Sequence, residues 1–330
     1  MSSMVPAAAV APGARPELSI VVIAFNMQRE LPRTLLSLSP AMQREASGQE
    51  YELIVVDNGS AAPLELASPD EYGVKVTLIR VDNASPSPCR AINHALRRCR
   101  APFVGVMIDG ARMASPGIVR HAILASRLQP RVVVSTLGFH LGPKMQMQSV
   151  HEGYSQVAED RLLAESRWQE DGYRLFGIAS LAGSSKGGWF KPIAESQALF
   201  MHRALWDELG GYDERFQSPG GGAVNLDTYR RACDLPDTEL IVLLGEGTFH
   251  QVHGGVATNA RTPVVSDFLD EYARIRGVPF AAPTRRPRYF GTEIAAASRF
   301  LRQSLEPILR EAGTLAPSDP AAVRRSNASL

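Results

Sequence analysis

Three apolar stretches decide the fold of this chain: LSIVVIAFN at Leu18–Asn26, YELIVVDN at Tyr51–Asn58 and PFVGVMID at Pro102–Asp109. Each is a nearly continuous apolar run, which is typical of a parallel strand covered by helices on both faces. Each run also ends in polar residues. Those residues would lie at the carboxyl edge of the sheet, where open α/β folds bind their ligands. The three runs therefore predict an α/β fold with a ligand site at that edge.

The segments between these strands have helical patterns. Leucines recur on one face of Glu30–Leu38, Pro88–Arg100 carries an apolar stripe, and Pro116–Leu128 is a third helix of this kind. Further strands are predicted at Val74–Val81 and Arg131–Leu137. Because strands and helices alternate up to about residue 140, we expect a doubly wound, mostly parallel sheet, which is a Rossmann-like nucleotide-binding arrangement.

The second half of the chain has a less regular pattern. Glu195–Gly211 predicts a strand, a turn and a short helix that ends at glycine, and Glu239–Leu244 predicts another strand. The Gly- and Ser-rich stretch Gly172–Gly188 reads as a mobile loop, and Gly291–Leu309 as a helix. We therefore divide one continuous globule as follows: a disordered leader 1–16, a nucleotide-sugar-binding half 17–140, a smaller acceptor-binding and catalytic half 141–282, a helical extension 283–315 and a disordered tail 316–330.

Composition narrows the class of protein. The 330 residues carry a formal net charge of +1, which gives no reason to expect nucleic acid as a partner. The three cysteines form no Cys-x-x-Cys pair, and one would be left over in any disulfide scheme. No apolar run approaches the roughly 20 residues that cross a bilayer. These features predict a cytoplasmic protein without a transmembrane segment.

The three strand ends, in this order, resemble those of the family 2 glycosyltransferases, whose nucleotide-binding domain has the GT-A fold. In that family the first strand closes on Asn, so the resemblance implies that Ala24, Phe25 and Asn26 line the pocket of the nucleotide base. The Asp after the second strand contacts the nucleoside, which here is Asp57. The third strand ends in Asp-x-Asp, which holds a metal; here Asp109 is present and Ala111 takes the second place.

Asp57 and Asn58 also have an explanation that needs no ligand. Asp-Asn-Gly-Ser is a strong turn sequence, and a turn alone accounts for both residues. Together with Asn26 and Asp109 at neighbouring strand ends, we favour a role in binding the nucleoside.

Asp109 follows a buried strand, where a carboxylate is costly to desolvate unless it is paired or bound to metal. Mg²⁺ or Mn²⁺ would suit such a carboxylate together with substrate phosphates. Arg112 could contact the diphosphate directly, although a solvated loop cation explains it equally well. In the family a late histidine returns to the metal. The sequence GTFHQVHGG offers His253 as the first candidate and His250 as the second, because a spacing of three in an extended chain separates their side chains.

The acceptor half offers two candidates for the catalytic base. Gly210–Phe216, GGYDERF, closely matches a family segment that precedes an acidic pair, and Asn225-Leu226-Asp227 follows it. Asp227 is therefore the first candidate, although a carboxylate in the first turn of a helix is favoured by the helix dipole alone. Glu195 is the second candidate, or it could orient acceptor hydroxyls.

The resemblance implies transfer of a sugar from a nucleoside diphosphate-sugar, with a UDP-sugar favoured, to a hydroxyl acceptor. It further implies inversion at the anomeric carbon and assistance by Mn²⁺ or Mg²⁺. The acceptor could be soluble or be presented by a membrane that the enzyme visits. Two alternatives remain open. A sugar nucleotidyltransferase shares the sheet topology but normally has a Gly-rich basic loop, which AFNMQREL lacks. A non-catalytic nucleotide-sugar sensor or scaffold is the other.

Overall fold

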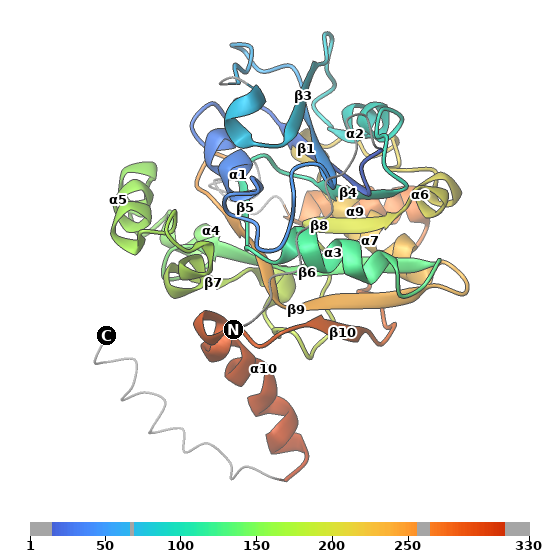
Figure 1. Cartoon of the computed structure of the whole chain (residues 1–330). Helices are drawn as coiled ribbons and strands as arrows, with labels where there is room; N and C mark the ends of the chain where they lie inside the picture. The colour runs from blue at the N-terminus through green and yellow to red at the C-terminus, as the bar shows by residue number, and fades with distance from the viewer. Residues whose placement is uncertain (1–14, 67–68, 256–264, 314–330) are drawn as a thin grey trace, which may run out of the picture.

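A single mixed sheet runs through the molecule in the computed structural model, which describes residues 15–66, 69–255 and 265–313 (Figure 1). The order of its strands along the main path is β10-β9-β6-β8-β4-β1-β2-β3. The bounds of these strands in chain order are β1 Leu18–Ala24, β2 Tyr51–Asp57, β3 Lys75–Arg80, β4 Phe103–Met107, β6 Val132–Leu141, β8 Ala198–His202, β9 Glu239–His250 and β10 Arg288–Gly291.

The sheet is mostly parallel, as the sequence predicts. β1 pairs in parallel with both β2 and β4, and β3 continues this parallel set at the edge. β8 is the exception, because it pairs antiparallel with β4 and β6. Since β8 comes from the second half of the chain and lies between two strands of the first half, the two predicted halves share one sheet.

A small extension of the same sheet lies beyond its main path. The carboxyl-terminal parts of β6 and β9 continue past a register shift at Ser135/Leu137. They are flanked by β5 (Arg112–Ala114), which pairs antiparallel with β9, and by β7 (Ala179–Leu181), which pairs antiparallel with β6. This extension, β5-β9-β6-β7, carries several of the predicted site residues.

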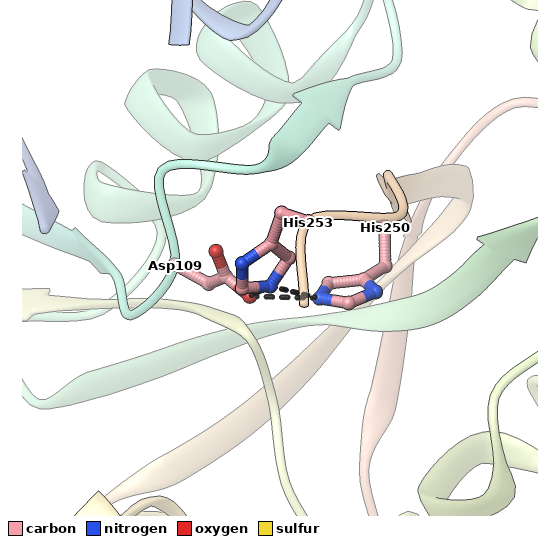
Figure 2. Close-up of side chains that lie close together, drawn as sticks. All are labelled: Asp109, His250 and His253. Atoms are coloured by element: carbon pink, nitrogen blue, oxygen red, sulfur yellow. Dashed lines mark hydrogen bonds and ion pairs between the residues drawn. The ribbon is translucent and has the colours of Figure 1, made fainter. Parts of the chain in front are cut away.

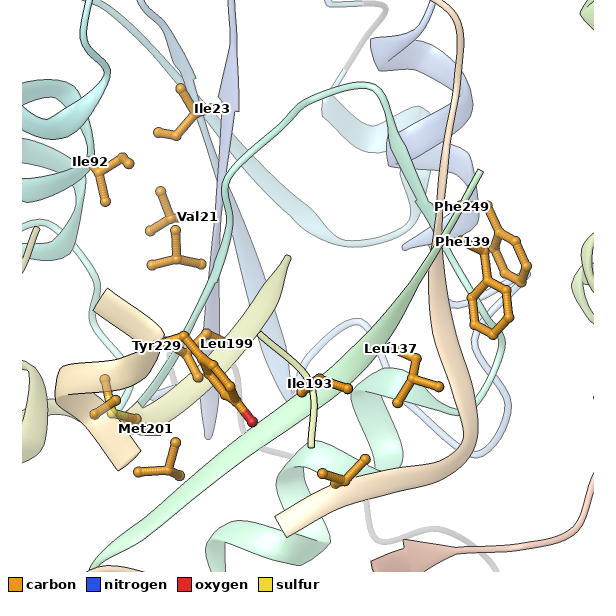
Figure 3. Close-up of a cluster of buried hydrophobic side chains, with 14 of the residues drawn as sticks. Val21, Ile23, Ile92, Leu137, Phe139, Ile193, Leu199, Met201, Tyr229 and Phe249 are labelled. Carbon is orange, nitrogen blue, oxygen red and sulfur yellow. The ribbon is translucent and has the colours of Figure 1, made fainter. Parts of the chain in front are cut away.

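Helices cover the sheet and define two apolar layers. Alternate residues of β1 belong to different clusters: Val21 and Ile23 to one, Ile20 and Val22 to the other. Figure 3 shows part of the first cluster, where Tyr229 lies beside the strand residues. The helices are α1 Leu31–Ser37, α2 Cys89–Leu96, α3 Ile118–Ser126, α4 Gln146–Ser149, α5 Gln156–Ser166, α6 Arg203–Leu209, α7 Val224–Asp234, α9 Val265–Arg276 and α10 Ser298–Glu311.

Two predictions for the irregular parts are wrong. The stretch 172–188 is not a loop: it forms the short helix Gly172–Ile178, β7 and a further turn, and it buries Phe176 in the core. The predicted helix Gly291–Leu309 begins only at Ser298, because Arg288–Gly291 pairs with β9 as an edge strand. Figure 1 shows α10 extending away from the rest of the molecule. The leader 1–14 and the tail from 314 lie outside the described residues.

Candidate active site

The three predicted strand ends lie side by side. β1 is flanked by β2 and β4, and Ala24 at the end of β1 is in register with Asp57 at the end of β2. Asp109 follows β4 by two residues. The sheet topology therefore groups Asn26, Asp57 and Asp109 at one edge, as the sequence predicts.

Asp109 is held in place by a turn and faces two histidines (Figure 2). Its Oδ1 accepts a hydrogen bond from the backbone N–H of Ala111 at 2.8 Å. Its Oδ2 lies 2.9 Å from His250 Nε2 and 3.4 Å from His253 Nε2. Only 17% of the Asp109 side chain is exposed. One carboxylate and two imidazoles thus converge on a small, mostly buried space.

The two histidines meet because β9 ends at His250. Their Nε2 atoms are 3.1 Å apart, and one ligand atom from each of the three residues lies within 4.8 Å of the others. The expectation that alternation along an extended strand separates His250 from His253 is therefore wrong. The chain leaves the extended conformation directly after His250 and returns the second ring to the first.

Gln146 of α4 fixes the orientation of the His250 ring. Its Nε2 donates to the His250 carbonyl at 2.8 Å, so its amide oxygen is the atom that meets His250 Nδ1. A carbonyl oxygen only accepts, so Nδ1 carries the proton. In the neutral ring Nε2 then presents a lone pair towards Asp109 and His253. Partners of this kind orient metal-binding histidines.

The charge states in this cluster follow from burial and from neighbouring charges. Burial lowers the pKa of His250 to about 4, in spite of the Asp109 carboxylate beside it. Burial also opposes the charged form of His253, but Asp109 outweighs it and raises the His253 pKa above its ordinary value. For Asp109, burial favours the neutral acid, yet His253 and His250 hold its pKa well below the usual range. Near neutral pH, Asp109 is ionised and His250 is neutral.

Arg112 is a buried cation next to this cluster. It lies in β5 opposite His250 and is 8% exposed. Its Nε and Nη1 are buried without a hydrogen-bond partner among the described residues. Burial lowers the pKa of the guanidinium, and the nearby carboxylates of Asp109 and Glu195 partly offset this effect. Burying guanidinium N–H groups without hydrogen-bond partners costs free energy, unless an anion or a water molecule accepts those hydrogen bonds.

Glu195 lies just before β8, close enough to Arg112 for the two charges to interact. Its Oε2 accepts a hydrogen bond from Asn225 Nδ2 at 2.7 Å. The same Nδ2 group donates to the carbonyl of Ser196 at 3.1 Å. The other carboxylate oxygen of Glu195 accepts no hydrogen bond from the described residues. Glu195 therefore has one oriented oxygen and one available oxygen.

Asp227 has a different environment, which argues against its predicted role as base. It is fully buried. Arg276 Nε meets its Oδ1 at 2.5 Å, and Arg231 Nε meets its Oδ2 at 2.7 Å. A second nitrogen of Arg276 also donates to Oδ2, at 2.7 Å. Guanidinium groups thus engage both oxygens of a buried carboxylate, an environment typical of a structural ion pair, and the role of Asp227 as base stays a prediction.

Asp57 forms the turn that its sequence predicts. It is 1% exposed, and its oxygens accept hydrogen bonds from the backbone N–H groups of Ser60 and Leu64. Arg80 adds an ion pair at 2.7 Å. Asn58 is buried and donates to the carbonyl of Ser85. The turn explanation for these two residues is sufficient in the structure, and nucleoside binding by them stays a prediction.

Asn26 and Phe25 lie at the surface of the same edge. Asn26 has a positive φ of 54°, and its Oδ1 accepts a hydrogen bond from the backbone N–H of Ala61. The Phe25 side chain is 52% exposed, which is unusual for a large apolar group. A ring exposed beside a sheet edge of this kind is available to stack on a planar ligand.

Sequence reasoning missed Gln146 and Asn225 as parts of the site. Gln146 belongs to no recognisable motif, and Asn225 was noted only as a neighbour of Asp227 in Asn225-Leu226-Asp227. Gln146 matters only because α4 brings it to β9, and Asn225 only because α7 packs against the start of β8. No local signal in the sequence would have found either residue.

Comparisons with known proteins agree with this geometry. Residues 19–109 match the family model described as Glycosyl transferase family 2. This part of the chain is therefore similar to the family 2 glycosyltransferases. The match begins in β1 and ends at Asp109, so it covers the three strand ends. No curated protein matches the sequence.

Solved structures show the same fold at low sequence identity. TarS from S. aureus aligns with 79% of this chain and 43% of its own, at 13% identity and a TM-score of 0.50. TarS 1–349 in complex with UDP-GlcNAc aligns with 88% of this chain and 73% of its own, at 14% identity and a TM-score of 0.51. The chain thus spans less than half the length of full TarS, and the expected GT-A fold is confirmed.

A third likeness is weaker. The mannosyltransferase PcManGT from Pyrobaculum calidifontis, in complex with GDP-Man and Mn²⁺, aligns with 97% of this chain and 82% of its own, at 16% identity. Its TM-score of 0.45 carries no argument for this chain. Within the described residues, no helix has the length and apolarity that a membrane span requires.

Proposed function

We propose that this protein is a glycosyltransferase that moves a sugar from a nucleoside diphosphate-sugar to a hydroxyl acceptor. One observation carries the proposal. An ionised carboxylate, the lone pair of a neutral His250 and the ring of His253 converge within hydrogen-bond distance. The Asp109 carboxylate and the lone pair of His250 repel each other unless a proton on His253 or a cation lies between them. Their place at the carboxyl edge of a family 2 sheet makes that cation part of a donor-binding site.

The residues fit a divalent metal ion. Asp109, His250 and His253 would hold it, with Gln146 orienting His250 from behind. Two imidazoles and one carboxylate suit Mn²⁺ better than Mg²⁺, which prefers oxygen ligands. When bound, the ion would stabilise the charge on the departing nucleoside diphosphate. His250 and His253 would thereby replace the second carboxylate that Ala111 lacks.

The remaining contacts with the nucleoside diphosphate-sugar are assigned from where the residues lie at the sheet edge. Arg112 would take the diphosphate with its unpartnered N–H groups. Ala24, Phe25, Asn26, Asp57 and Asn58 would line the nucleoside pocket, with Phe25 against the base. The family relationship favours a UDP-sugar. Because Asp57 is already paired with Arg80, a base could reach its carboxylate only if that ion pair loosens.

Glu195 would act as the base for the acceptor. Its free oxygen takes the proton from the acceptor hydroxyl. As the new bond from that oxygen to the anomeric carbon forms, the bond to the diphosphate oxygen breaks, and the nucleoside diphosphate leaves with the electron pair. Attack from the face opposite the leaving group inverts the anomeric carbon. The acceptor could be soluble or presented at a membrane surface, and three free, buried cysteines agree with a cytoplasmic location.

Thermal unfolding with UDP-, GDP-, dTDP- and CDP-sugars, each with and without Mn²⁺, tests the donor site. A ligand that binds only the folded state raises the melting temperature by mass action. We expect a Mn²⁺-dependent shift with one nucleotide class, and loss of the metal-dependent part in Asp109→Asn. The exposed Asp207 of α6 supplies the control, Asp207→Asn. No shift with any donor would contradict the proposed function.

Turnover separates a transferase from a sensor. Release of free nucleoside diphosphate from the bound donor, with water as a slow acceptor, is expected of the enzyme. Tight donor binding with no release, and with no change on adding hydroxyl acceptors, would instead favour a non-catalytic sensor.

A further inference from the structure

We infer that Asn225 is the positioning residue for the base, Glu195. This inference rests on the proposed function, because it assigns Asn225 a role in the reaction of Glu195. It adds a residue that no strand-end motif includes, and it explains how one carboxylate can serve the acceptor when Asp227 is ion-paired.

The contacts leave Asn225 little freedom. Its side chain is 5% exposed. Both N–H bonds of Nδ2 are used, one for Glu195 Oε2 at 2.7 Å and one for the Ser196 carbonyl at 3.1 Å. The hydroxyl of buried Tyr212 lies 3.5 Å from its Oδ1, on the opposite side of the amide. The amide therefore has one orientation, in which the donor faces Glu195.

A donor in this position fixes the rotamer of the Glu195 carboxylate through a charge-assisted hydrogen bond. The Glu195 oxygen that Asn225 does not contact is then the one that receives the acceptor proton. Two other titratable groups face Glu195: the Arg112 guanidinium of β5, and the Tyr212 hydroxyl, which lies beyond Asn225. Asn225 differs from both because it touches the carboxylate directly.

The substitution Asn225→Asp is the decisive test, because it changes the charge and keeps the shape. It would place two carboxylates at hydrogen-bond distance, and such a pair holds a proton to higher pH than a single carboxylate does. In donor turnover with water as acceptor, we expect the acid limb of the rate profile to move up by at least about one pH unit. Asn225→Ala should lower kcat about tenfold with the donor KM unchanged. Glu195→Gln should lower kcat about 100-fold or more.

A merely structural Asn225 would give a different result. If Asn225→Asp keeps the wild-type pH profile while Glu195→Gln loses activity, Asn225 does not position the base. If Glu195→Gln retains full activity, Glu195 is not the base and the inference fails, although the transferase stands. If wild-type protein turns over no donor in the panel, the failure belongs to the proposed function.

A second measurement needs no donor. The melting temperature of Asn225→Asp should fall between pH 5 and pH 8 relative to wild type, because ionising both carboxylates of the pair destabilises the fold. The double variant Glu195→Gln/Asn225→Asp should lose that dependence. A single variant with the wild-type pH dependence would show that the two side chains do not meet, and would overturn the inference.

Discussion

Two clusters of buried charged residues differ in whether their charged groups have hydrogen-bond partners. This difference separates a structural ion-pair network from a candidate ligand site. Around Asp227, every carboxylate oxygen faces a guanidinium, with Arg231 and Arg276 supplying the donors. Around Asp109, the neighbours at Oδ2 are two imidazoles, one of them neutral, and Nε and Nη1 of the nearby Arg112 are buried without a hydrogen-bond partner among the described residues. The first cluster is complete as it stands. The second would be completed by a cation and an anion, and the proposed metal ion and diphosphate would supply both.

The largest effect should come from breaking the complete cluster. Asp227→Asn leaves Arg231 and Arg276 without a countercharge, so we expect the free energy of unfolding to drop by about 3 to 5 kcal/mol. Chemical denaturation measures this loss. Donor affinity should be unchanged at temperatures where the variant is folded. A folded variant that binds donor normally but has lost turnover would restore Asp227 as the base.

The incomplete cluster should respond in the opposite sense. In Asp109→Asn, the new amide can donate to the lone pair of His250 Nε2, so the metal-free variant should be at least as stable as wild type. The stabilisation by Mn²⁺ should disappear, a loss of about 2.7 kcal/mol at a hundredfold excess over the dissociation constant. Melting curves with and without Mn²⁺ measure both quantities. If the metal-free variant is strongly destabilised, then Asp109 has mainly a structural role, as the ion-paired Asp227 does.

Glu159 of α5 is intermediate between the two clusters in how fully its charge is paired. It is fully buried and shares the guanidinium of Arg29 with Glu30 and Asp160. Burial raises the pKa of Glu159 to about 7, against an ordinary value of 4.5. Its stabilising contribution is therefore present below about pH 4.5 and is lost as the pH rises through about 7.

Glu159→Gln removes that titration. Between pH 5 and pH 8, wild type should lose about 2 kcal/mol of stability relative to this variant, as measured by denaturant titration across that range. Glu165→Gln, on the same helix but exposed, is the control. Parallel pH curves for wild type and Glu159→Gln would place Glu159 among the fully paired carboxylates.

The smallest effect concerns Arg112. Arg112→Met removes a buried, unpartnered charge while keeping most of the side-chain length, so the protein should not lose stability. Donor affinity should fall about tenfold, or about 1.4 kcal/mol, because the diphosphate loses a charge-assisted hydrogen bond. Calorimetric titration measures the donor affinity. The control is Arg90→Met, because the Arg90 side chain is 72% exposed. If Arg112→Met keeps its donor affinity but is less stable than wild type, Arg112 has a structural role and does not bind the diphosphate.

Much of the fold and part of the site followed from local sequence. β1, β2 and β4 were predicted because continuous apolar runs are a local property, and the helices between them because an apolar stripe is one too. Once three parallel strands are adjacent, their polar ends must meet at one edge. That reasoning found Asn26, Asp57 and Asp109 without any knowledge of tertiary contacts.

The same reasoning failed where long-range packing decides. Gly172–Gly188 has no periodicity, yet its aromatic residues complete the core, since a short irregular helix buries side chains without leaving a repeating pattern. The ion pairs of Asp227 were not predicted either, because Arg276, which lies 49 residues further along the chain, has no local signal that relates it to Asp227.

The sequence by itself determined which strands form, where they end, and that a carboxylate follows the third. The tertiary structure alone decided which charged groups are satisfied. It turned the chain after His250 so that two histidines meet, brought Gln146 to orient one of them, closed Asp227 between two arginines and left Glu195 with a free oxygen. The physical reason is that strand formation depends on neighbours along the chain, whereas the state of a charge depends on whatever folds against it.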